Sequence, residues 1–105
     1  MGDRGQVKIG SVLLYSHWNG TELKANVKKA LAKRWRWDDA EYLTRIIFDV
    51  MTQNQRDEET GFGIGTTLHT DLNNPLIEVY VEKQTVKINK IEKTFEEFIK
   101  EEVEL

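Results

Sequence analysis

The sequence predicts a single α+β domain, in which one antiparallel sheet of three or four strands carries helices mainly on one face. Three observations lead to this prediction. A strongly amphipathic segment ends at Met51, short β-prone segments separated by turn residues fill the second half, and 105 residues allow one core of modest size. The expected order is β-α-α-β-β-β-α over residues 1–105. The ends, 1–6 and 104–105, are expected to be flexible.

The first strand is expected from Val7 to His17, because β-branched, aliphatic and aromatic residues dominate this segment. Gly10-Ser11 predicts a kink or bulge within it. The unbroken apolar run over 12–15 favours a strand that is covered on both faces. Asn19-Gly20 then predicts a turn into a helix over 22–34. The apolar stripe of that helix consists of Leu23, Val27, Ala30 and Leu31.

The clearest element is the amphipathic helix that follows Trp37. Its apolar residues recur at spacings of three, four and seven, so they line one stripe that must be buried. They are Ala40, Leu43, Ile46, Ile47, Val50 and Met51. Asp38, with Glu41 three residues later, predicts an N-cap and a capping box. A polar loop is expected from Gln53 to Thr60.

Turn residues divide the second half into three predicted strands, over 61–68, 76–81 and 85–88. Consecutive strands joined by short links usually pair antiparallel, so a meander is expected. Thr94 with Glu97 predicts a second capping box. The buried stripe of the last helix is expected to be Phe95, Phe98, Ile99 and Val103.

Composition limits the cellular setting. The chain has no cysteine, which excludes disulfides and thiolate metal sites. No apolar run approaches the roughly 18 residues of a membrane-spanning helix, and residues 1–10 lack an apolar signal segment. The sequence therefore predicts a cytoplasmic protein without a membrane partner. Abundant Glu and Lys without Cys is also typical of thermophilic proteins and fits an archaeal source.

Charge is divided unevenly along the chain. Residues 1–37 hold eight of the 15 Lys and Arg and only two acids, which gives +6, whereas the remaining residues hold seven bases and 16 acids, which gives −9. Such a division indicates either a basic face that binds a partner or two halves that attract each other within the fold.

The end of the first predicted strand is the first candidate site. If the strand persists, Tyr15 and His17 point to one face and Trp18 to the other. Side chains at strand ends are held by the scaffold and remain accessible from the turn that follows. His17 is a candidate general acid or base, because its ordinary pKa lies near 6.5. Alternatively, His17 caps the turn and Trp18 covers an edge of the core.

The segment Tyr15-Ser16-His17-Trp18-Asn19-Gly20 resembles a Tyr-x-His-Trp-Asp-Gly signature of small proteins from phage and prokaryotic genomes. Asn19 departs from the Asp of that signature. The family carries no assigned activity, so the resemblance implies a fold neighbourhood and no reaction.

Glycines at positions 61, 63 and 65 form the second candidate site. A phosphate-binding glycine loop requires a helix directly after it, and none is expected here. In a strand, Gly61, Gly63 and Gly65 instead leave one face bare, while Phe62 and Ile64 fill the other. A bare face admits another backbone, an aromatic ring or a ligand. One of this chain's own tryptophans is the alternative occupant.

The third candidate site is a basic, aromatic segment over 24–37 that contains no acid. Lysines neutralise phosphates, and tryptophans stack on unpaired bases for roughly 1–3 kcal/mol each. The sequence pI of 5.4 and the acidic last helix weigh against nucleic-acid binding. The predicted contact residues are Lys24, Lys28, Lys33, Arg34, Trp35, Arg36 and Trp37.

No cofactor, metal or catalytic residue is predicted. His17, His69 and Asp71 could contribute metal ligands, but two histidines in the whole chain form a weak set. Ser11 and Ser16 have no evident base to activate them. The leading hypothesis is a small non-enzymatic domain that binds a protein partner or associates with itself. RNA or single-stranded DNA binding, and a small-ligand or enzyme site around His17, are the alternatives.

Overall fold

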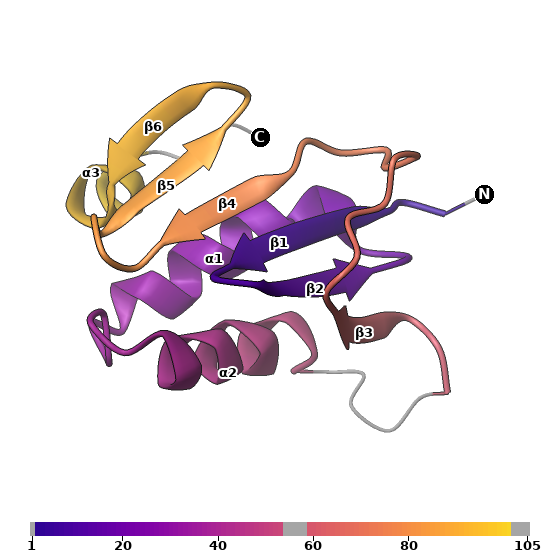
Figure 1. Ribbon diagram of the computed structural model, residues 1–105, viewed down its shortest axis with the longest axis horizontal. Helices are drawn as coiled ribbons and strands as arrows, with labels where there is room; N and C mark the ends of the chain where they lie inside the picture. Colours follow the sequence, from indigo (N-terminus) through magenta and orange to yellow (C-terminus); the bar gives the residue numbers. More distant parts are fainter. Residues whose placement is uncertain (1, 54–58, 102–105) are drawn as a thin grey trace.

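Six strands form one sheet in the order β3-β2-β1-β4-β5-β6 (Figure 1). The computed structural model describes residues 2–53 and 59–101. Within them the strands are β1 Gly5–Ile9, β2 Val12–Ser16, β3 Phe62–Gly65, β4 Ile77–Tyr80, β5 Thr85–Ile88 and β6 Ile91–Thr94. The helices are α1 Leu23–Ala32, α2 Ala40–Met51 and α3 Phe95–Lys100, and a 3-10 turn, Gly20–Glu22, precedes α1. The predicted α+β class is confirmed.

The predicted first strand is in fact a hairpin of two strands, β1 and β2. Ile9 pairs with Val12, so Gly10 and Ser11 form a two-residue loop. Gly10 has φ of +62°, which suits the first loop position of a type II′ turn. Gly10-Ser11 therefore reverses the chain, and the prediction of a kink within one strand is wrong. Gly5, expected in the flexible N-terminal segment, begins β1 instead.

The sheet is mixed and not wholly antiparallel. β1 pairs antiparallel with β2 on one side and parallel with β4 on the other. After β3 the chain passes through residues 66–76 and enters the sheet again on the far side of β1 (Figure 1). Because β3 and β4 do not pair, the predicted meander is confirmed only for the pair β4–β5, and the structure extends it to β6.

Strand β6 was absent from the predicted order. It forms a hairpin with β5 through Asn89 and Lys90, whose φ angles are +52° and +70°. Positive φ at both central residues defines a type I′ turn, which usually has Asn-Gly. Lysine at the second position hides this turn in the sequence. The added strand places α3 directly after β6, with the predicted Thr94–Glu97 capping box confirmed.

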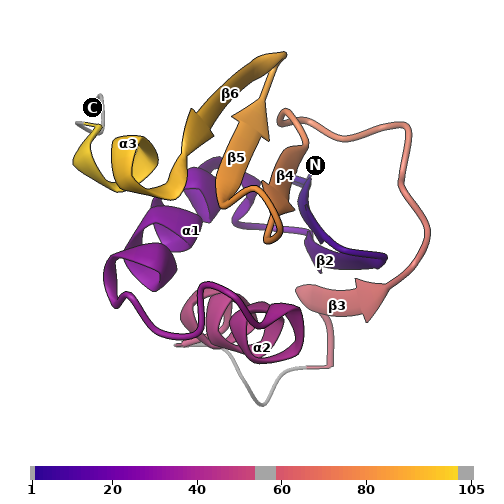
Figure 2. The same ribbon diagram turned by 60° about the vertical axis from the view of Figure 1, so that its left-hand side comes forward.

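Helices α1 and α2 pack on one face of the sheet (Figure 2). The predicted stripes of α1 and α2 are buried, apart from Ala40, which is exposed, whereas Ile99 of the predicted α3 stripe is only partly buried. Asp39, rather than Asp38, is the N-cap of α2, because its carboxylate accepts hydrogen bonds from the backbone N–H groups of Glu41 and Tyr42. Val103, and the middle of the predicted 53–60 loop, lie outside the described residues.

The core lies between the helices and the alternate residues of the sheet. Val7, Ile9 and Leu14 are at most 1% exposed and pack against the stripes of α1 and α2. Each fully buried side chain of this size contributes about 1.5–3 kcal/mol relative to exposure. Because successive residues of a strand alternate, Gln6 and Tyr15 lie on the opposite face, which is called the open face below.

Candidate functional site

Two glycines form a bare strip on the open face. In β3, Gly63 pairs with Tyr15 and Gly65 pairs with Leu13, so both glycines share the face of those side chains. A methyl group added at Gly65 would meet no atom within 4 Å, and one added at Gly63 would meet only Tyr15 Cβ, at 3.9 Å. The strip is therefore open to a side chain or ligand from outside.

A shallow pocket of about 190 Å³ lies over this strip. Leu13, which is 5% exposed and belongs to no helix-side cluster, forms its apolar part. Tyr15 and His69 form one wall, with ring centroids 5.1 Å apart, and Thr66 and Thr67 border another part of the pocket. No tryptophan lines it, so the expectation that one of the chain's own tryptophans covers the glycines is wrong.

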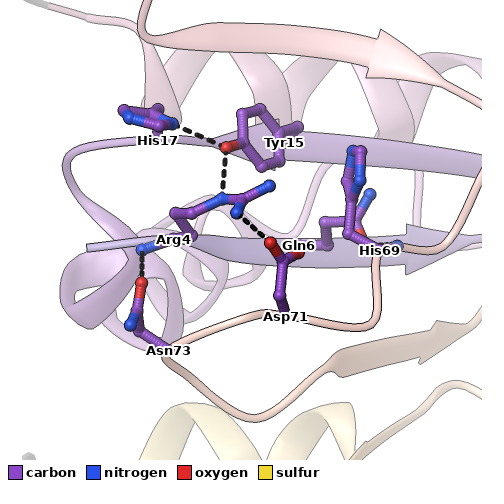
Figure 3. Close-up of polar contacts among 7 residues, drawn as sticks. All are labelled: Arg4, Gln6, Tyr15, His17, His69, Asp71 and Asn73. Atoms are coloured by element: carbon purple, nitrogen blue, oxygen red, sulfur yellow. Dashed lines mark hydrogen bonds and ion pairs between the residues drawn. The ribbon is translucent and has the colours of Figure 1, made fainter. Parts of the chain in front are cut away.

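The hydroxyl of Tyr15 is the centre of a polar cluster (Figure 3). It accepts a hydrogen bond from Arg4 Nε at 2.8 Å and lies 2.7 Å from His17 Nδ1. Arg4 Nη1 donates to Asp71 Oδ2 at 2.5 Å. This hydrogen bond lowers the pKa of Asp71, while the bonds to Tyr15 and Asp71 raise that of Arg4. The cluster holds the phenol ring in place at the pocket wall.

The segment over 66–74 is fastened to the sheet by Gln6, whose side chain is 1% exposed. Gln6 Nε2 donates to the carbonyl of Thr67 at 3.1 Å, and Gln6 Oε1 accepts from His69 N at 3.0 Å. Asn73 Oδ1 accepts from Arg4 N at 2.9 Å, farther along the same segment. These bonds position the His69 ring beside Tyr15.

One pocket therefore brings together three of the sequence candidates, Tyr15, Gly63 and Gly65. His17 does not line this pocket but contacts the Tyr15 hydroxyl. Trp18 packs edge-on against His17, with centroids 4.2 Å apart, and remains 51% exposed. Gly61 is buried outside the pocket, where its carbonyl accepts from His17 N at 2.8 Å. Sequence reasoning missed Arg4, Gln6, Leu13 and two threonines and considered His69 only as a metal ligand, because only strand register and the 66–74 segment bring these residues here.

The described residues contain no group of three His, Cys, Asp or Glu side chains arranged to hold a metal ion. Of the three ligands considered from sequence, His17 contacts Tyr15 and Asp71 is paired with Arg4. His69 packs its ring on Tyr15. Each of the three side chains considered as a metal ligand thus contacts Tyr15 or Arg4 of the polar cluster.

The outer edge of β3 is the second part of the site. The backbone N–H of His17 donates a hydrogen bond to the carbonyl of Gly61. Because hydrogen-bonded pairs alternate along an antiparallel ladder, the backbone groups of Gly63 and Gly65 also bond to their partners in β2. The backbone N–H and C=O of Phe62 and Ile64 consequently point outward. Ile64 is also 64% exposed. β3 thus ends the sheet with an uncharged edge beside a bare glycine strip.

The opposite edge, β6, differs in charge. Its sequence, Ile91–Thr94, contains Glu92 and Lys93. Both charges are used within the chain, since Glu92 accepts from Thr85 and Lys93 pairs with Glu101 of the α3 end. Charged residues on edge strands oppose the addition of another strand, and β3 lacks them.

The basic segment is largely engaged within the chain. Lys24 pairs with Glu101 at 2.8 Å, and Arg34 pairs with Glu96. Lys28 is 9% exposed and donates to the backbone carbonyl of Glu101. Trp37 donates to the Leu31 carbonyl and packs on Phe95. The exposed residues among the predicted contact residues are Lys24, Lys33, Arg34, Trp35 and Arg36, although acids engage Lys24 and Arg34.

Fold and site together define a small α+β domain with one uncharged sheet edge beside a shallow pocket. The chain matches no protein-family model, no curated protein and no solved structure. Among the helices of residues 2–53 and 59–101, none is long and apolar enough to cross a membrane.

Proposed function

We propose that the protein is a non-enzymatic cytoplasmic interaction domain that accepts an extended segment of a partner protein along the outer edge of β3. The outward backbone groups of Phe62 and Ile64 would bond to the incoming strand, as in other cases of strand addition to a sheet edge. The observation that carries this proposal is the contrast between the two edges. β3 is uncharged and exposes Ile64, whereas β6 is charged.

The glycine strip favours a particular kind of incoming strand. Because Phe62 and Ile64 would form the hydrogen-bonded pairs, the residue opposite Gly65 would form a non-hydrogen-bonded pair, in which side chains approach most closely. An aromatic side chain there can cross the bare backbone of Gly65 and reach Leu13 in the next strand, since strands lie about 4.8 Å apart. The partner segment is thus expected to carry an aromatic residue at this position.

A second copy of the chain fits the edge less well. If two β3 strands paired around a twofold axis, residues of the same face would meet, so glycines would oppose glycines and the pocket would stay unfilled. A foreign strand with a large side chain buries this surface. The proposal therefore commits to a partner protein, and self-association becomes an outcome that the experiment detects.

Selection from a display library of random linear peptides tests this function. The library is selected on the wild-type protein, and bound peptides are then measured on Ile64→Lys and Ile91→Lys. The two isoleucines are matched controls, since they are 64% and 61% exposed and lie on opposite edges of the same sheet. A lysine on an edge strand disfavours strand addition.

The proposal predicts enriched peptides with an aromatic residue, an affinity loss of about tenfold or more in Ile64→Lys, and unchanged affinity in Ile91→Lys. Sedimentation of the same proteins shows whether the wild type dimerises. A dimer that Ile64→Lys abolishes would make a second copy the occupant of the edge. Peptides that bind both variants equally well, or no enrichment, would contradict the proposal.

A further inference from the structure

A second binding surface lies on the helix layer, away from the open face of the sheet. It is a cleft of about 200 Å³ between α1 and α2. Basic and aromatic side chains surround it, and two α2 side chains form its floor. The lining residues that carry the argument below are Lys29, Lys33, Trp35, Arg45, Ile46 and Val50.

Trp35 is the exposed aromatic group of this cleft. Trp35 lies in the chain shortly after α1 and is 57% exposed, whereas Trp37 packs on Phe95. Lys33 Nζ lies 4.9 Å from the centre of the Trp35 ring. An indole ring that is more than half exposed and has a cation beside it provides a stacking surface for a nucleobase.

The charges of the cleft are mainly positive. Lys29 of α1 and Lys33, the residue after α1, are exposed, and the Arg45 side chain is 60% exposed on α2. Asp49 is the acid of the cleft, and its carboxylate accepts a hydrogen bond from Arg45 Nη1 at 2.7 Å. Gln53 Oε1 lies 3.4 Å from Lys29 Nζ. Among the residues that the structure describes, the cleft therefore combines three cations with one carboxylate, and this charge complements an anionic partner.

The floor distinguishes between classes of anionic partner. Ile46 is 4% exposed and Val50 is 9% exposed, so an incoming protein helix would bury little additional apolar surface. Affinity at this cleft must come from cations and from stacking on Trp35. These are the two contributions on which proteins that bind single-stranded nucleic acids depend.

We propose that this cleft binds single-stranded nucleic acid, with one base stacked on Trp35 and adjacent phosphates held by Lys29, Lys33 and Arg45. This site uses Lys29, Lys33 and Trp35 of the basic segment that the sequence indicates, and it adds Arg45 of α2. Lys24, Lys28 and Arg34 do not line the cleft, and acidic or carbonyl groups of α3 and the residue after it engage them. The proposal is independent of strand addition at β3.

Fluorescence anisotropy of a labelled, mixed-sequence single-stranded DNA tests this site on the full chain. The variants are Trp35→Ala, the double variant Lys29→Glu/Lys33→Glu, and the control Lys83→Glu/Lys90→Glu. The two double variants change the net charge equally, and the control residues lie on turns of the β4–β6 hairpins. Polyglutamate serves as an anionic competitor without bases, and circular dichroism verifies folding of each variant.

The wild type is expected to bind at about 50 mM salt and to lose affinity about ten- to twentyfold at about 200 mM, as three phosphate contacts predict. Trp35→Ala and the α1 double variant should each weaken binding about tenfold or more, and the control variant should bind as the wild type does. The absence of binding at the lower salt would overturn the proposal. Full affinity in folded Trp35→Ala, or equal displacement by polyglutamate, would do so as well.

Discussion

The phenol of Tyr15 joins residues that are far apart in the chain. Its hydroxyl contacts Arg4 and His17, and its ring packs on His69. The guanidinium of Arg4 can only donate, so the hydroxyl proton remains available to the His17 ring nitrogen. Tyr15 is thereby held at the wall of the glycine pocket, where a partner side chain would meet a preorganised surface.

Gln6 offers a test at the scale of a single residue. Gln6→Leu keeps a buried side chain of similar size but leaves the Thr67 carbonyl and the His69 N–H without their partners. We expect the free energy of unfolding to fall by about 1–3 kcal/mol in urea titrations. Amide exchange at His69 should accelerate more than at Val7 in the core. Unchanged exchange at His69 would show that Gln6 does not fasten this segment.

The contrast between the two long helices and the sheet shows what the sequence predicts well. Helices α1 and α2 were predicted because their apolar residues repeat locally with the helical period, and the capping box of α3 is equally local. The β1–β4 pairing joins residues about 70 positions apart, and no local pattern specifies it. Positive φ at Lys90 likewise hid the β5–β6 turn.

The same difference between local patterns and long-range pairing applies to the candidate site. Tyr15, His17, Gly63 and Gly65 could be selected from sequence, because strand ends and alternating glycines are local signals. The meeting of Tyr15, Gly63 and Gly65 in one pocket depends on the β2–β3 register, which the sequence does not specify. The acidic end of the chain was correctly considered as a cover for the basic segment, but which cations it engages depends on where α3 packs.

Glu101 offers a test at the scale of the α3 contact. Hydrogen bonds from Lys24 and Lys93 lower its pKa to about 2 from its ordinary value of 4.5. Because the pKa is lower in the folded state, the charged Glu101 stabilises the fold above about pH 4.5, and this contribution is lost as the pH falls toward 2.

Glu101→Gln is therefore expected to lower the free energy of unfolding by about 1 kcal/mol at neutral pH. It should also flatten the decline in stability between about pH 4.5 and 2. Urea unfolding at a series of pH values measures both effects. Glu82→Gln, at an exposed turn residue, is the control. An unchanged pH profile in Glu101→Gln would mean that these ion pairs do not hold the end of α3 to α1.

At the scale of the whole molecule, the fold separates two proposed binding surfaces. The glycine pocket lies on the open face beside β3, and the basic cleft lies on the helix layer between α1 and α2. One surface is uncharged and uses backbone hydrogen bonds, whereas the other depends on cations and one indole ring. Since they share no residue, the domain could hold a protein segment and a nucleic acid together.

Amide hydrogen exchange of β3, with and without the tightest peptide from the library, tests strand addition most directly. The Ile64 N–H points outward and gains a partner when a strand adds, whereas the N–H groups of Gly63 and Gly65 already bond to β2. We predict that the peptide slows exchange at Ile64 far more than at the two glycines. Unchanged exchange at Ile64 in the saturated complex would contradict strand addition at this edge.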